Sequence, residues 1–147
     1  MNKTRNNTLI RYADEALNKQ TANNDISRIL ADNNRDIEST YNGSIASLGV
    51  SIAMSELRPA LAIYFQDRPN SATHPRANRR SVLDVIARII TIDARAQNIN
   101  NWDFSANDRY AENLFRYAIE NDDANLKQEV IDCAIALKQI VRTYNLI

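Results

Sequence analysis

Apolar residues recur at steps of three and four along most of the chain. Behind Thr8, a candidate N-cap, the first stripe consists of Leu9, Tyr12, Ala13, Ala16 and Leu17. This spacing places side chains on one face of an α-helix, and a threonine before the first apolar residue is a typical helix start. A polar stretch then leads to Ile26, Ile29 and Leu30, again at helical spacing. The pattern predicts a first helix and a short second one.

The most apolar stretch of the chain, YNGSIASLGVSIAMSELRPALAIYF, runs from Tyr41 to Phe65. Asp36 or Ser39 would cap a helix that leads into it. The stretch is apolar or small nearly all round, which is typical of the central helix of a domain. Within a continuous helix the ring of Pro59 would press on the carbonyl of Ser55 and remove one hydrogen bond. We therefore expect a kink or break between 54 and 57.

The same stretch holds both glycines of the chain. A glycine inside a helix costs about 1 kcal/mol relative to alanine, so its presence needs a reason. Gly49 shares a stripe of small residues with Ala46 and Ala53, which predicts the close approach of a neighbouring helix backbone. Gly43 is expected near the helix start, where its flexibility costs less.

A long polar segment with two prolines, residues 66–80, is the only long loop that the sequence predicts. After it, Ser81 with Asp84 three residues later has the form of a helix start. The following stripe consists of Val82, Val85, Ile86, Ile89 and Ile90. Their β-branching permits a strand, but the helical offsets and the length of the run favour a helix.

The last third of the chain contains two more helical stripes. Ser105 is a candidate cap for the first, and Asp122 or Asp123 for the second, which extends over about 20 residues, or about 30 Å. No segment shows the alternation of a strand, and no repeat is present. The sequence therefore predicts an all-α fold, a compact bundle of about five to seven helices with a long C-terminal helix, in one domain over residues 1–147.

Composition agrees with a folded domain. The 147 residues are 44% hydrophobic and 24% charged, which is ordinary for a globular protein of one domain. The single Cys133 has no internal disulfide partner, and the first residues, MNKTRNN, lack the apolar core of a secretory signal. Both features predict a cytoplasmic location. The uncharged run 39–55 is too short and too rich in serine to span a bilayer.

Catalytic side chains are scarce. The only histidine, His74, lies between two prolines of the predicted loop, far in sequence from Cys133. Nothing places a nucleophile beside an oriented base, zinc would need more Cys and His than the chain has, and no Gly-rich phosphate loop is present. We expect no enzymatic activity, no metal and no cofactor, and a small hydrolase is the least favoured class.

The net charge is zero, but only four of the 18 basic residues are lysine. Arginine suits phosphate contacts, and a basic loop that enters a helix N-terminus also favours anions. The residues predicted to bind RNA are Arg68, Arg76, Arg79, Arg80 and Arg88, with Lys138 and Arg142 on the last helix as a weaker group. A solvated basic turn explains the first group equally well, and compensation of the helix dipole explains the second.

The segment Tyr41–Phe65 also resembles the signature region of a known family, the small helical subunit of type III-B CRISPR effector complexes (the Cmr small-subunit family). The matching positions are Tyr41, Ser44, Ser47, Leu48, Ile52, Leu57, Pro59, Leu61, Ala62 and Tyr64. The rest of the chain agrees only in length, helical character and the long last helix. Glu56 is a departure, because the family usually has glycine there.

The resemblance implies a non-catalytic subunit of an antiviral ribonucleoprotein. Such subunits stack with copies of themselves beside the backbone subunits that hold the guide RNA, and they help form a basic groove along the guide–target duplex. The implied partners are the guide and target RNA backbones and other effector subunits, without a membrane. The family offers no catalytic residue to carry over. The alternative is a helical protein-interaction module that does not bind nucleic acid.

Overall fold

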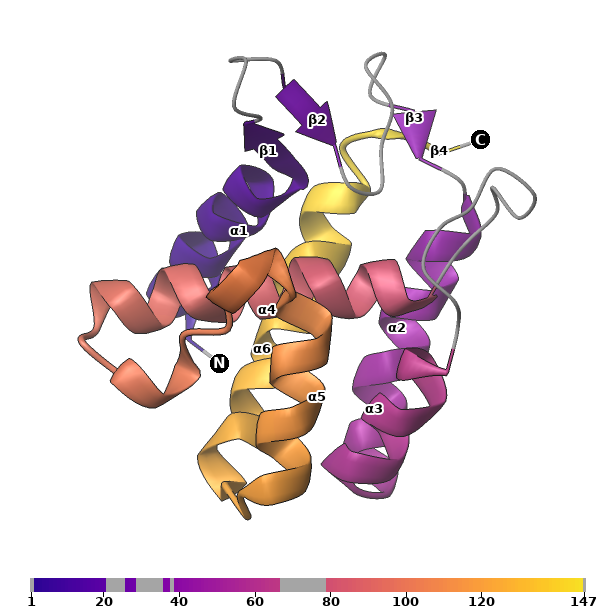
Figure 1. Ribbon diagram of the computed structural model, residues 1–147. Helices are drawn as coiled ribbons and strands as arrows, with labels where there is room; N and C mark the ends of the chain where they lie inside the picture. The colour runs from indigo at the N-terminus through magenta and orange to yellow at the C-terminus, as the bar shows by residue number, and fades with distance from the viewer. Residues whose placement is uncertain (1, 21–25, 29–35, 38, 67–78, 147) are drawn as a thin grey trace.

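A computed structural model of the protein describes residues 2–20, 26–28, 36–37, 39–66 and 79–146, and it confirms the all-α fold (Figure 1). The α-helices are α1 (Lys3–Leu17), α2 (Ser39–Met54), α3 (Leu57–Phe65), α4 (Arg79–Ala96), α5 (Tyr110–Glu120) and α6 (Ala124–Val141). Two 3₁₀ turns, η1 (Asn100–Trp102) and η2 (Ala106–Asp108), lie between α4 and α5. Among the described residues, no helix is both long and apolar enough to cross a lipid bilayer.

Helix α4 runs across the middle of the molecule and is covered by the other helices (Figure 1). It packs against α1, α3, α5 and α6, while α6 in turn packs against α1 and α2. More than half of the residues of α4 are buried, including the whole predicted stripe from Val82 to Ile90. The helical spacing of that stripe therefore predicted its structure correctly despite its β-branched residues.

The predicted break between α2 and α3 is confirmed. Helix α2 ends at Met54, Glu56 has an extended backbone, and α3 begins at Leu57. Pro59 is thus the third residue of α3, where a backbone N–H would have no partner within the helix. The hydroxyl of Tyr64 on α3 donates to the carbonyl oxygen of Ser44 on α2, at 2.5 Å, and joins the two halves.

Gly49 does not have the predicted environment. A Cβ atom built on it would lie 4.0 Å from the Cβ of Ala134 on α6, which is ordinary van der Waals contact, and no neighbouring backbone atom lies within 4 Å. The expected close approach of a helix backbone is therefore wrong. Gly43 lies near the start of α2 as predicted, with open space around it.

Gly49→Ala is accordingly expected to stabilise the protein. The substitution removes a helix-propensity cost of about 1 kcal/mol and meets no steric obstacle, so the melting temperature should rise by about 2–4 °C. Gly43→Ala is a matched control in the same helix and should change stability in the same direction. If Gly49→Ala lowered the melting temperature and Gly43→Ala did not, a neighbouring helix would have to approach Gly49 closely after all.

Three predicted helix starts are wrong. Helix α1 begins earlier than Thr8, with the side chain of Asn2 accepting from the backbone N–H of Arg5 at 2.7 Å. Its first turns have no buried side chain and therefore left no apolar stripe. Helix α4 begins at Arg79, before Ser81, and Ser105 precedes η2 instead of α5.

Other predicted boundaries agree with the structure. Helix α2 begins at Ser39, one of the two expected caps, and Asp123 caps α6 by accepting from the N–H groups of Asn125 and Leu126. Helix α6 has 18 residues, which corresponds to about 27 Å. Asp36, the other candidate start before α2, belongs to a strand.

The structure also contains short strands that the sequence did not predict. Strand β1 (Asn18–Gln20) pairs antiparallel with β2 (Ile26–Arg28), and β3 (Asp36–Ile37) pairs parallel with β4 (Asn145–Leu146). The expected helix at Ile26 is therefore wrong, while Ile29, Leu30 and most of the predicted loop, 67–78, lie outside the described residues. Strands of two or three residues are too short to show an alternating pattern.

Candidate functional site

The basic residues at the start of α4 pack on the end of α3. Arg80 donates from Nε and Nη2 to the backbone carbonyl oxygen of Phe65, at 3.2 and 2.8 Å, and its guanidinium lies 3.8 Å from the centre of the Phe65 ring. The guanidinium of Arg79 lies 5.5 Å from the centre of the Tyr64 ring. Arg80 thereby satisfies a carbonyl at a helix C-terminus that would otherwise lack a partner.

Arg88 lies further along α4 in a different environment. Its guanidinium bonds to the carboxylates of Asp84 and Asp108, at 2.9 and 3.3 Å, and lies 4.0 Å from the centre of the Tyr110 ring. Only 12% of the side chain is exposed. The positive charge of Arg88 is offset within the fold, so a phosphate would have to compete with two carboxylates for it.

Lys138 and Arg142 lie at the C-terminal end of α6. Arg142 is the C-cap residue and is exposed, while Lys138 is half-buried beside α2. Neither forms an ion pair within the described part of the chain. Among the predicted RNA-binding residues that the structure describes, they are therefore the cations best able to meet an outside anion. The predicted Arg68 and Arg76, and also His74, lie outside the described residues.

The predicted site residues thus form separate groups. Arg79 and Arg80 cover the end of α3, Arg88 faces the α4–α5 connection, and Lys138 and Arg142 end α6. Along the axis of α4, Arg79 and Arg88 are about 13 Å apart.

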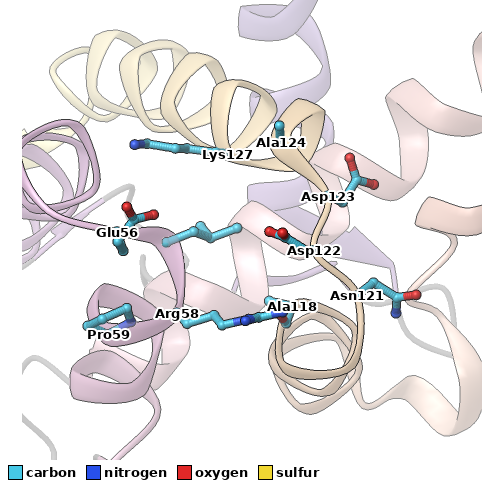
Figure 2. A pocket seen from close by; sticks show the side chains of 10 residues that line it. Glu56, Arg58, Pro59, Ala118, Asn121, Asp122, Asp123, Ala124 and Lys127 are labelled. Atoms are coloured by element: carbon cyan, nitrogen blue, oxygen red, sulfur yellow. The ribbon is translucent and has the colours of Figure 1, made fainter.

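A cleft of about 550 Å³ lies between the first turn of α3 and the connection from α5 to α6 (Figure 2). Its charged lining residues are Glu56, Arg58, Asp122, Asp123 and Lys127. Arg58 donates from Nε to the carbonyl oxygen of Ala118 at 2.7 Å and so provides a partner for a carbonyl in the last turn of α5. The lining contains neither histidine nor cysteine, and its mixed charges do not select an ion of one sign.

Asp123 in this cleft organises a polar cluster around the start of α6. Its Oδ2 accepts from the indole N–H of Trp102 at 3.0 Å and from the hydroxyl of Tyr117 at 2.8 Å, while its Oδ1 caps α6. Although burial alone would raise the pKa of Asp123, these donors hold it below its ordinary value. The sequence predicted the cap but not the aromatic partners.

Sequence reasoning missed a buried charge cluster that joins three helices. Arg5 on α1 donates to both carboxylate oxygens of Asp93 on α4, at 2.5 and 2.6 Å, and to Oε2 of Glu129 on α6 at 2.8 Å. Asp93 and Glu129 are only 1% and 7% exposed. The signal was present, because both acids lie at apolar-stripe positions, Asp93 seven residues after Ile86 and Glu129 three after Leu126.

The cluster shifts the proton affinities of its members. Burial, with hydrogen bonding to Asp93 and the charge of that carboxylate, raises the pKa of Glu129 to about 8. Burial would also raise the pKa of Asp93, but hydrogen bonds from Arg5, Glu129 and Gln97 lower it below its ordinary value. Burial raises the pKa of the Cys133 thiol, which lies 3.8 Å from Glu129 Oε1.

Carboxylates with separated pKa values can act as a general acid and base, but such groups must reach a substrate. Neither Asp93 nor Glu129 lines the cleft of Figure 2. They are also absent from a recess beside Arg88 and Tyr110 and from a trough between Gly49 on α2 and Ala134 on α6. In the described part of the chain, no group of three or more His, Cys, Asp or Glu side chains is arranged to hold a metal ion. The geometry of the cluster fits a structural role.

Comparison with known proteins adds no relative: no protein-family model, curated protein or solved structure matches the chain.

Proposed function

We propose that the protein is a non-catalytic small subunit of a type III-B CRISPR RNA-guided effector complex, which lies beside the backbone subunits and contacts the guide or target RNA backbone. The observation that carries the proposal is the resemblance of the segment Tyr41–Phe65 to the signature region of that family. In this chain the segment forms α2 and α3, and its large matching side chains, such as Leu48 and Leu61, belong to the core. Because the matching residues belong to the core, the resemblance concerns the fold and does not identify the residues that would contact RNA.

The RNA-contacting surface in this proposal is centred on Lys138 and Arg142, since no carboxylate of the described residues pairs with them. Arg80 and Arg88 contribute by holding α3 and the α4–α5 connection in place. Contacts to phosphate oxygens do not read base sequence, so binding should be insensitive to RNA sequence and sensitive to salt.

The double substitution Lys138→Ala and Arg142→Ala tests this surface. Each lost phosphate contact on a single strand should reduce the slope of log affinity against log salt by about 0.7, so the pair should reduce it by up to about 1.4. Binding of fluorescently labelled single-stranded RNA, followed by anisotropy over a salt series, measures the slope.

The matched control removes two positive charges elsewhere. Arg109 and Arg116 on or beside α5 are both exposed and both pair with Glu112. Their double alanine variant should leave the slope nearly unchanged. Equal effects of the two double variants would show that net charge, and not this surface, determines binding.

A second candidate is a helical protein-interaction module, favoured by an apolar trough between α2 and α6. Ala46, Gly49 and Ala53 line one side, and Ile131 and Ile135 line the other. Val50, which also lines the trough, is 57% exposed. Exposed apolar side chains that gather in one trough are typical of a protein-docking surface. This candidate predicts no RNA binding even at low salt.

A further inference from the structure

The trough between α2 and α6 is the place where exposed apolar side chains of two helices come together. It has a volume of about 320 Å³, and Val50 and Ile135 on its two sides are 57% and 43% exposed. Met54, one turn beyond Val50 on the same face of α2, is 83% exposed. An apolar patch of this kind marks a surface that another macromolecule covers.

The trough has the dimensions of a helix-binding groove. Its α2 side extends from Ile45 to Ala53 and its α6 side from Ile131 to Lys138, which is about 10–12 Å, or two helical turns, on each side. Gly49 has no side chain to fill the trough, and no contact within the fold requires a glycine there. A helix with apolar residues over two turns of one face would therefore find room between α2 and α6.

The charge of the trough is one-sided. Among the described residues that line it, Lys138 is the only charged one, and it lies at the end nearest the C-terminus of α6. No carboxylate of the described residues pairs with it, and α2 on the opposite side has no charged residue. A partner that covers the half-buried Lys138 must bring a carboxylate, because burying an unpaired ammonium group is costly.

A second copy of the chain does not meet this requirement. Two troughs that face each other across a two-fold axis would bring identical residues together. Each Lys138 would then face a described lining without a carboxylate, and like charges across an interface oppose association. The complementary partner is an acidic amphipathic helix of another protein.

We propose that the trough between α2 and α6 binds an amphipathic helix of a protein partner, whose apolar face packs on Val50 and Ile135 and whose carboxylate pairs with Lys138. The contact goes beyond the proposed function and requires no RNA; within the proposed effector complex it would join this subunit to a neighbour. While the trough is occupied, Lys138 is paired and Arg142 remains available to RNA phosphate.

Two synthetic peptides test the contact. Each is a labelled alanine-based helix of about 18 residues, long enough to be helical in water, with leucines over two turns of one face. One peptide has glutamate at both ends of the leucine run, so that a carboxylate meets Lys138 in either orientation, and the other has lysine there. Fluorescence anisotropy of the peptides, titrated with the unmodified protein without RNA, gives both affinities. The glutamate peptide should bind at least about tenfold more tightly. Equal affinities, or no binding of either peptide, would overturn the proposal.

Variants of the trough locate the contact. Lys138→Glu should reverse the preference, so that the lysine peptide binds more tightly than the glutamate peptide. Val50→Asp places a charge in the trough and should abolish binding of both peptides, while the matched Ile119→Asp alters a similarly exposed residue of α5, 48% exposed, and should not. Circular dichroism checks that the variants remain folded. Unchanged binding by folded Val50→Asp would show that the peptide binds elsewhere and the proposal fails.

Light scattering separates a protein partner from a second copy. Any self-association of the unmodified protein should persist in Val50→Asp. A dimer that Val50→Asp dissociates and Ile119→Asp does not would mean that a second copy covers the trough, which would overturn the proposal without bearing on RNA binding.

Discussion

Replacing Arg5 by alanine is expected to lower the free energy of unfolding by about 3–5 kcal/mol at neutral pH. Arg5 is the only cation that contacts the buried carboxyl groups of Asp93 and Glu129 among the described residues. Its removal leaves an ionised Asp93 in the interior with no positive partner, and the cost of burying an unpaired charge exceeds the value of the lost hydrogen bonds. Urea unfolding at pH 7 measures the effect.

The control for this substitution is Lys3→Ala, two residues earlier in α1. Lys3 is exposed and has no ion pair within the described residues, so its removal should change stability by less than about 0.5 kcal/mol. The cost of Arg5→Ala should also shrink at pH 5, because the carboxyl groups without their cation take up protons more easily. A cost no larger than that of Lys3→Ala would mean that the cluster does not hold α1.

Asp123→Ala is expected to cost about 2–4 kcal/mol. The substitution removes the cap of α6, worth about 1 kcal/mol, and leaves the indole N–H of Trp102 and the hydroxyl of Tyr117 without their acceptor, worth a further 1–3 kcal/mol, roughly. Because donors hold the pKa of Asp123 below its ordinary value, its contribution is complete above that ordinary value and is lost as the pH falls through the folded-state pKa.

Asp123→Ser divides the two contributions. Serine retains a capping hydroxyl but cannot reach both aromatic partners, so it should recover about 1 kcal/mol relative to alanine. The neighbouring Asp122 is exposed, and Asp122→Ala should be nearly neutral. Thermal unfolding of the three variants gives the comparison, and equal stability of Asp123→Ala and Asp122→Ala would show that the contacts of Asp123 do not stabilise the fold.

Much of the fold follows from local sequence. The stripes of α4 and α6 predicted helices because their apolar faces are complete, and Pro59 marked the break before α3 because its ring excludes a continuous helix. The first turns of α1 could not be predicted in the same way, because polar contacts hold them and they have no apolar stripe. The paired strands are too short for any periodic signal.

The candidate site was less predictable, because its contacts join residues far apart in the chain. Arg80 donates to the backbone carbonyl of Phe65, and Arg88 pairs with Asp108. Both guanidinium groups therefore make contacts within the fold, which a local cluster of basic residues in the sequence does not reveal. The buried cluster joins positions 5, 93 and 129. Its one local sign was an acidic residue at an apolar-stripe position, which is unusual enough to mark a partner from another helix.

The most direct test of the proposed function is the binding of the unmodified protein to single-stranded RNA of mixed sequence, measured by fluorescence anisotropy from low to physiological salt. An RNA-contacting subunit should bind at low salt, with log affinity falling linearly as log salt rises and with little change between RNA sequences. Absence of RNA binding at the lowest salt would contradict the proposal and favour the protein-interaction module.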